Sequence, residues 1–181
     1  MLNSKQTEAK IQLLQTLAKS ISKTTEFDAV LTATLRTVCK SLNWDYGEAW
    51  MPNQGGMILE LSSAWYINPT KSLDQVSDLH KFRLCSEAFI LSPDVGLPGR
   101  VWSSQQPEWL KDASANSETY FLRHYIAKAF GIKTGLGVPI LVDDQVISVL
   151  VFFRSEICEI DPQLIDLVMA AAAQVALKCC C

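Results

Sequence analysis

The feature that most limits how this chain can fold is a densely punctuated stretch at residues 96–112. Gly96 and the pair Pro98-Gly99 break the chain first, and Pro107 breaks it again. Between the two breaks there is room for one short turn of helix. A strand, a sharp turn, a short helix and a second strand in this order would cover one face of a sheet and leave a hollow beneath. Small ligands bind in hollows of this kind.

Several other segments carry apolar residues at helical spacing. They are residues 5–23, 27–42, 68–83, 120–130 and the segment that begins at 161–162. Residues 68–83 are polar and predict only a short or mobile helix. Residues 27–42 have an apolar stripe broad enough to pack on a sheet, and Thr25 and Asp28 precede and open this helix with the pattern of a capping box. Residues 5–23 have a narrow apolar seam, which suits a contact between helices: Ile11, Leu14, Leu17 and Ile21.

Alternating or wholly apolar runs predict the strands. They are a hairpin of residues 44–51 and 57–66, single strands at 85–91 and 109–111, and a hairpin of residues 137–142 and 146–154. Residues 149–153 are apolar at every position, so their strand is expected at the centre of the sheet, covered on both faces. The order of elements predicts an α+β fold. In it, terminal helices cover one face of an antiparallel sheet and lid helices cover a pocket on the other.

Composition excludes several classes of protein. The chain has 181 residues, 49% of them hydrophobic and 19% charged, which is typical of one globular domain and not of a disordered chain. Its net charge is −3, so no general attraction to nucleic acid or to an anionic membrane is expected. No apolar run of roughly 18 residues and no signal peptide is apparent, and the expected location is the cytoplasm.

The punctuated stretch also carries a family resemblance. Gly-Leu-Pro-Gly-Arg-Val-Trp at 96–102 and Pro-Glu-Trp at 107–109 resemble the central segment of GAF domains of bacterial, often cyanobacterial, histidine kinases and response regulators. Residues 121–131 and 137–153 match the same family in the expected order. The resemblance covers nearly the whole chain and implies a GAF/PAS-like fold in a two-component signalling protein. We therefore expect a dimerisation or linker helix at 1–23, a GAF domain at 24–178 and an exposed tail at 179–181.

Together, the punctuated stretch and the resemblance define a candidate pocket between the sheet and the lid. Arg123 or Arg100 would meet an anionic group there, and His124 would lie beside them. The full set of candidate ligand-binding residues is Trp65, Phe89, Arg100, Trp102, Trp109, Phe121, Arg123 and His124.

The cysteines and histidines predict neither disulfides nor a metal site. Cys39, Cys85 and Cys158 are isolated in apolar segments and are expected to be buried and reduced, whereas the consecutive cysteines at 179–181 are expected to be exposed. The two histidines, at positions 80 and 124, lack partners at ligand spacing.

The resemblance to GAF domains also indicates which cofactors are not expected. Bilin-binding GAF domains attach the chromophore through a cysteine between the lid and the last pocket helix, but residues 113–125 contain none. Covalent bilin attachment of the usual kind is therefore not expected. Cys85 alone does not reproduce the paired pocket cysteines of GAF-fold methionine sulfoxide reductases.

Three functions follow as hypotheses. The first is a non-catalytic sensory domain that binds an unidentified small molecule and signals through terminal helices in a parallel homodimer, to an effector domain outside this chain. The second is a ligand-free structural dimerisation module, because a filled apolar core would have the same sequence pattern. The third is a thiol enzyme or an unusual tetrapyrrole binder that uses Cys85.

Overall fold

The computed structural model of this chain describes residues 4–179. Its centre is a five-stranded antiparallel sheet with the strand order β2-β1-β5-β4-β3. The strands are β1 Tyr46–Pro52, β2 Leu59–Ile67, β3 Glu108–Leu110, β4 Thr134–Val142 and β5 Gln145–Arg154. As the apolar run at 149–153 predicts, β5 is the central strand and is buried along most of its length. The expected α+β class is confirmed.

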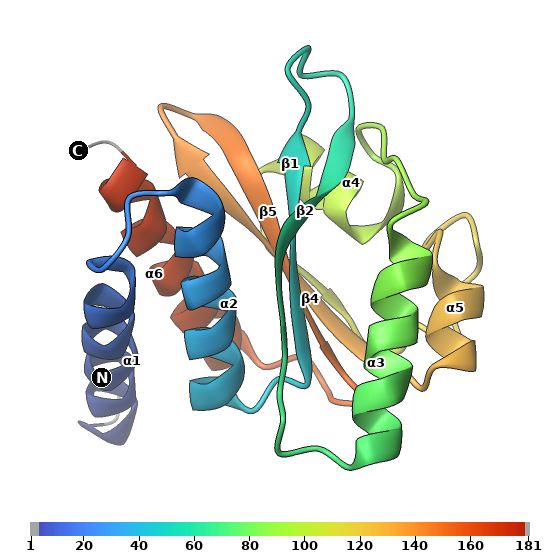
Figure 1. Cartoon of the computed structure of the whole chain (residues 1–181), viewed down its shortest axis with the longest axis horizontal. Helices are drawn as coiled ribbons and strands as arrows, with labels where there is room; N and C mark the ends of the chain where they lie inside the picture. Colours follow the sequence, from blue (N-terminus) through green and yellow to red (C-terminus); the bar gives the residue numbers. More distant parts are fainter. Residues whose placement is uncertain (1–3, 180–181) are drawn as a thin grey trace.

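Two helical layers cover the sheet (Figure 1). On one face, α2 (Phe27–Leu42) and α6 (Pro162–Cys179) pack on the strands, and α1 (Ser4–Ile21) lies outside them against both helices. On the other face lie α3 (Leu73–Ser86), α4 (Gly96–Ser104) and α5 (His124–Ala129). Each layer closes its own hydrophobic cluster against the sheet. The punctuated stretch forms α4 and β3, as expected.

The buried side of α1 agrees only in part with the predicted seam. Leu13, Leu17 and Ile21 are buried, whereas Ile11 remains 51% exposed. Gln174 of α6 donates from its side-chain amide to the backbone carbonyl of Leu14 at 3.1 Å, which fixes α1 beside α6. Most of the apolar seam is therefore covered by helices of the same chain.

Two local predictions were wrong. The start of α2 has no side-chain cap at Glu26, and Asp28 instead accepts from the hydroxyl of Ser63 at 2.6 Å, which joins α2 to β2. Cys85 belongs to α3 and not to a strand, since the capping box of Ser72 and Gln75 starts that helix and it runs on to Ser86.

The Asp143–Asp144 turn between β4 and β5 is the predicted tight hairpin. Both aspartates have positive φ, at 49° and 60°. This conformation matches the twist of the two strands and is one that aspartate tolerates.

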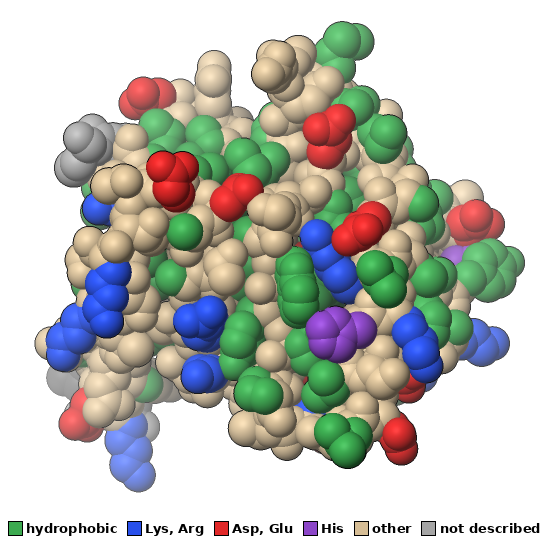
Figure 2. Space-filling model, viewed as in Figure 1, with side chains coloured by type: hydrophobic (Ala, Val, Ile, Leu, Met, Phe, Trp, Pro, Cys, Tyr) green, Lys and Arg blue, Asp and Glu red, His purple; other side chains and the backbone are tan. Residues whose placement is uncertain are grey.

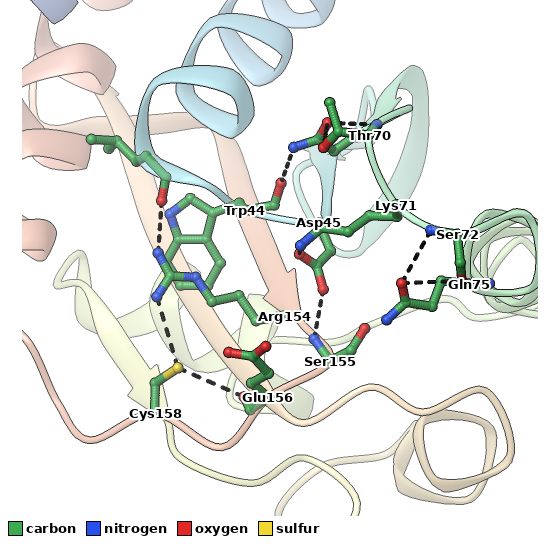
Figure 3. A network of polar contacts seen from close by, with 12 residues as sticks. Trp44, Asp45, Thr70, Lys71, Ser72, Gln75, Arg154, Ser155, Glu156 and Cys158 are labelled. Atoms are coloured by element: carbon green, nitrogen blue, oxygen red, sulfur yellow. Dashed lines mark hydrogen bonds and ion pairs between the residues drawn. The ribbon is translucent and has the colours of Figure 1, made fainter.

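A polar network closes the end of the sheet opposite the β1–β2 turn (Figure 3). Arg154 lies 4.4 Å above the ring of Trp44 and donates to the carbonyl of Leu42 at 2.7 Å. Asp45 pairs with Lys71 at 2.6 Å and accepts from the backbone of Ser155 at 2.8 Å. These contacts hold together the chain around α2, β5 and the loop before α3, so we assign them a structural role.

Within the described chain, α6 alone is long and apolar enough to cross a membrane by length and composition. The core helix of a globular protein passes the same test. Here α6 packs on β4 and buries Leu164, Val168 and Val175 against the sheet.

Candidate functional site

A buried polar cluster lies on the lid side of the sheet. Tyr46, Glu48 and Trp50 alternate along β1, and alternate residues of a strand share one face. The Glu48 carboxylate accepts three hydrogen bonds: from the hydroxyl of Tyr46 at 2.9 Å, from Nε1 of Trp50 at 2.8 Å and from Nη2 of Arg123 at 2.7 Å. The side chains of Glu48 and Arg123 are 0% and 1% exposed. An ion pair is thus sealed between the sheet and the lid.

Arg123 reaches this position from the residue directly before α5. Its second terminal nitrogen, Nη1, donates to the hydroxyl of Ser86 at 3.0 Å, at the end of α3. Its guanidinium carbon lies 5.1–5.5 Å from the ring centroids of four aromatic side chains: Trp50, Phe82, Phe121 and Phe153. Cation–π contacts of this kind stabilise a desolvated arginine.

The buried charges of this cluster are largely satisfied by hydrogen bonds within it. A buried charge pair is costly to desolvate and is tolerated when hydrogen bonds satisfy its remaining donors and acceptors, as they do for the Glu48 carboxylate. Burial, followed by the neighbouring Glu48 carboxylate, raises the pKa of Tyr46 well above its ordinary value. Tyr46 therefore keeps its proton and remains a donor.

A second arginine in the same layer is less well satisfied. Arg83 of α3 is 7% exposed, and its Nη2 donates to the backbone carbonyl of Ser62 at 2.8 Å. Its Nε and Nη1 have no hydrogen-bond partner in the structure. The nearest carboxylate oxygen, on Glu87, lies 3.6 Å from Nε, beyond hydrogen-bond distance.

The structure brings together only part of the residue set predicted for the pocket. Phe121 and Arg123 belong to the cluster itself. The other aromatic residues of the lid side are half-buried around it: Trp65, Phe89 and Trp102.

Three predicted residues lie elsewhere. Arg100 is paired with Glu108 at 2.6 Å, and its guanidinium stacks 4.0 Å above the ring of Tyr120. The ring of His124 lies 3.8 Å from that of Tyr125 with a tilt of 41°, and its Nδ1 is buried without a hydrogen bond. Trp109 packs on the opposite face of the sheet. It cannot line a lid-side pocket, because β3 turns its side chain toward the terminal helices.

Sequence reasoning missed Glu48, Tyr46, Ser86 and Arg83. The alternation of residues 46, 48 and 50 was a usable signal, because it places a carboxylate between two aromatic side chains on one face of a buried strand. A carboxylate on such a strand requires a buried donor.

Two hollows of the structure lie away from this cluster. One, of about 750 Å³, is on the terminal-helix side and is lined by Phe27, Val30, Met51 and Ile147, among others. Another, of about 400 Å³, lies beside β3, next to Trp109 and Tyr120. Neither is lined by Glu48 or Arg123.

The prediction for the cysteines is correct only in part. Cys39 is buried, and its pKa is raised well above the ordinary value by burial and then by Asp45. Cys85 is exposed and Cys158 is half-buried, so neither is a core residue. Cys179 is exposed, and positions 180–181 of the predicted tail lie outside the described residues. Between residues 4 and 179, no three metal-binding side chains come together.

A sequence model of one protein family, described as the GAF domain, matches residues 24–177. The chain belongs to the GAF domain family. The fold agrees with this assignment. Solved structures of GAF domains have the same fold at low sequence identity, and a likeness at such identity is evidence for the fold alone.

Two solved structures illustrate the likeness. The GAF domain of a phosphoenolpyruvate-protein phosphotransferase from Coxiella burnetii has a TM-score of 0.72 at 16% identity and covers 94% of this chain and 92% of its own. Free methionine-R-sulfoxide reductase from Neisseria meningitidis, in complex with its substrate, has a TM-score of 0.71 at 13% identity and covers 99% and 92%.

Curated relatives match over a shorter stretch. Transcription factor bHLH13 of Arabidopsis thaliana is 36% identical over 72 residues, which are 40% of this chain and 12% of that protein. Basic helix-loop-helix protein A of Pisum sativum is 31% identical over 70 residues, which are 39% of this chain and 11% of that protein. The matched stretch is thus a small part of each of these longer proteins.

Proposed function

We propose that this chain is a non-catalytic regulatory GAF domain in which the protein's own Arg123 occupies the space beneath the lid where a small molecule would otherwise bind. The domain therefore acts as an interaction and dimerisation module of a larger protein, and not as a receptor for a small molecule. One observation carries this proposal: Arg123 is fully buried, paired with Glu48 and surrounded by four aromatic rings. A ligand at this position would have to displace a charge pair that is already satisfied.

The position of the candidate nucleophile supports a non-catalytic role. Cys85, the thiol that an enzyme would use, is exposed on α3, whereas the polar cluster is sealed beneath that helix. A nucleophile and the groups that activate it need to lie within hydrogen-bond reach of one another.

The outer faces of the terminal helices provide the surface for a homodimer in this proposal. Ile11 of α1 is 51% exposed and Leu177 of α6 is 69% exposed. Exposed apolar side chains on neighbouring helices favour a self-complementary contact with a second copy. Leu17 is fully buried and belongs to the core of one chain, so it is not a suitable probe of the dimer.

The host protein is a regulator in either of two settings. The resemblance of residues 96–112 favours a cytoplasmic two-component signalling protein, whereas the names of the curated relatives favour a regulator of transcription. In both settings the effector would lie outside this chain.

Native mass spectrometry of freshly purified, reduced protein tests the occupied site and the dimer together. We expect twice the chain mass with no additional small molecule. The double variant Ile11→Glu/Leu177→Glu should be monomeric, whereas the control Lys128→Glu, on exposed α5, should remain dimeric. A stoichiometric adduct that disappears in Arg123→Met would overturn the occupied-site proposal, and a monomeric wild-type protein would overturn the dimer.

A second candidate, a sensor of a small anion, is favoured by Arg83. Its buried Nε and Nη1 lack acceptors, and a carboxylate or phosphate oxygen would supply them. In this case the adduct should persist in Arg123→Met and be lost in Arg83→Met.

A further inference from the structure

The edge strand β2 carries a second candidate interaction site. It lies between α2 and α3 and forms one border of the sheet, so its outer backbone edge faces away from β1 (Figure 1). Edge strands left open in this way pair readily with another extended chain, and proteins normally cover or block them.

Only the first half of this edge is covered. Leu59 and Leu91 exchange two backbone hydrogen bonds, at 2.7 and 3.1 Å, so Leu91 of the same chain pairs with the outer edge of β2 at this position. Next, β2 has a bulge, because Glu48 pairs with Trp65 while Trp50 pairs with Leu61. The Ser62 carbonyl in this bulge accepts from Arg83. Within the described residues, no backbone group outside the ladder with β1 pairs with positions 63–67, and the Ala64 N–H in this stretch donates to the Ser62 hydroxyl at 3.0 Å.

The uncovered half differs in charge from the covered half. Glu60 and Glu87 are exposed around the covered half. Asp28 lies at the boundary of the two halves, where its carboxylate accepts from the hydroxyls of Ser62 and Ser63 at 3.3 and 2.6 Å. Beside the uncovered half, α2 exposes Arg36 and Lys40, one helical turn apart. Asp78, on the facing helix α3, is engaged by Lys81 at 3.2 Å. The uncovered half therefore has a basic border along α2.

Aromatic side chains stand on both faces of the uncovered half, and hydrophobic side chains and a histidine lie over this part of the surface (Figure 2). Half-buried Tyr66 faces α2, where Arg36 lies 5.9 Å from its ring centroid. Half-buried Trp65 faces α3 and meets the exposed ring of His80 at 5.4 Å. A chain added to this edge would alternate its side chains between these two faces.

We propose that positions 63–67 of β2 bind an extended segment of a partner protein in which acidic and apolar residues alternate. Its backbone pairs with the open edge and continues the pairing that Leu91 begins. Its acidic side chains lie on the α2 side, against Arg36 and Lys40, and its apolar side chains lie against Trp65. Recognition by strand addition takes its affinity from the backbone pairing and its specificity from the two faces.

The probe that tests this proposal is a short, end-blocked peptide of alternating Glu and Val, titrated into the ¹⁵N-labelled full chain. We expect the amide signals of residues 63–67 to shift and to exchange more slowly with solvent. A peptide of alternating Lys and Val should not bind. The Glu-Val peptide with N-methyl groups along its pairing edge should not bind either, because it cannot donate the backbone hydrogen bonds.

Variants separate this edge from the rest of the surface. Arg36→Glu/Lys40→Glu should weaken the Glu-Val peptide about tenfold, through the loss and reversal of two border charges. Lys128→Glu, on the far helix α5, should leave the affinity for the Glu-Val peptide unchanged.

The proposal fails if shifts are absent or map to the terminal helices, or if the Lys-Val or N-methylated peptide binds equally well. It also fails if the signals of residues 63–67 shift with protein concentration alone, since a second copy would then take this edge.

Discussion

Glu48 and Arg123 are 75 positions apart in the sequence and meet at 2.7 Å beneath the lid helices. This contact joins β1 to the residue directly before α5, and it brings a full charge of each sign into the hydrophobic core. The lid is therefore held to the sheet by a specific polar contact in addition to apolar packing.

Removing one member of this pair should be strongly destabilising. Glu48→Ala leaves Arg123 buried without its counter-charge, and we expect a loss of about 3–5 kcal/mol in the free energy of unfolding. The half-exposed pair of Arg100 and Glu108 is the control, and Glu108→Gln should cost no more than about 1 kcal/mol. Urea unfolding followed by tryptophan fluorescence measures both. Equal losses in the two variants would contradict a special role for the buried pair.

Tyr46 should make stability depend on pH in the alkaline range. Its pKa is raised in the folded state, so the folded protein keeps a proton that the unfolded chain releases near pH 10. This contribution is complete below the unfolded pKa and is lost as pH rises, by up to about 1.4 kcal/mol per pH unit. Tyr46→Phe removes this dependence, so its unfolding free energy should fall less steeply than that of the wild type. Parallel slopes above pH 10 would show that Tyr46 does not titrate in this way.

The thiols should react in an order set by burial. Iodoacetamide under native conditions should modify Cys85 rapidly and Cys39 only after unfolding, because burial and Asp45 keep Cys39 protonated. Intact and peptide mass spectrometry of timed samples gives both rates. A Cys85→Ser variant should lose the fast internal site, and fast modification of Cys39 in the native protein would contradict the structure.

A side chain at Gly99 should destabilise the fold. A Cβ at this position would lie 2.5 Å from the carbonyl oxygen of Ser92, which belongs to the tight loop that leads into α4. Gly99→Ala should therefore cost about 1–3 kcal/mol, as overpacking commonly does. Gly55→Ala is a matched control, because its nearest atoms outside the neighbouring residues are 3.9 Å away, and its stability should change little. Thermal unfolding that gave the two variants the same midpoint would contradict this packing.

The fold was largely predictable because its main elements follow hydrophobic periodicity. The unbroken apolar run at 149–153 indicated the central strand, and the Asp143–Asp144 turn indicated the hairpin around it. Apolar content misled at 85–91, since it does not distinguish a strand from the end of a helix followed by an apolar loop. The helix at that place is determined by the cap at Ser72, which lies far upstream.

The site was less predictable for a different reason. Arg123 could be placed under the lid from the sequence, and its charge suggested an anionic ligand. What satisfies that charge is Glu48, a residue on a distant strand whose meeting with Arg123 depends on the register of the whole sheet. Sequence spacing alone does not carry such a pairing.

Chemical rescue of an Arg123→Ala variant tests most directly whether the protein's own guanidinium fills the space beneath the lid. In this variant, millimolar methylguanidinium should enter the vacated space, pair with Glu48 and raise the midpoint of thermal unfolding. The wild-type protein, whose space is filled, and the Glu48→Ala/Arg123→Ala variant, which lacks the counter-charge, should gain nothing. Equal stabilisation of all three proteins, or no stabilisation of Arg123→Ala, would contradict the account.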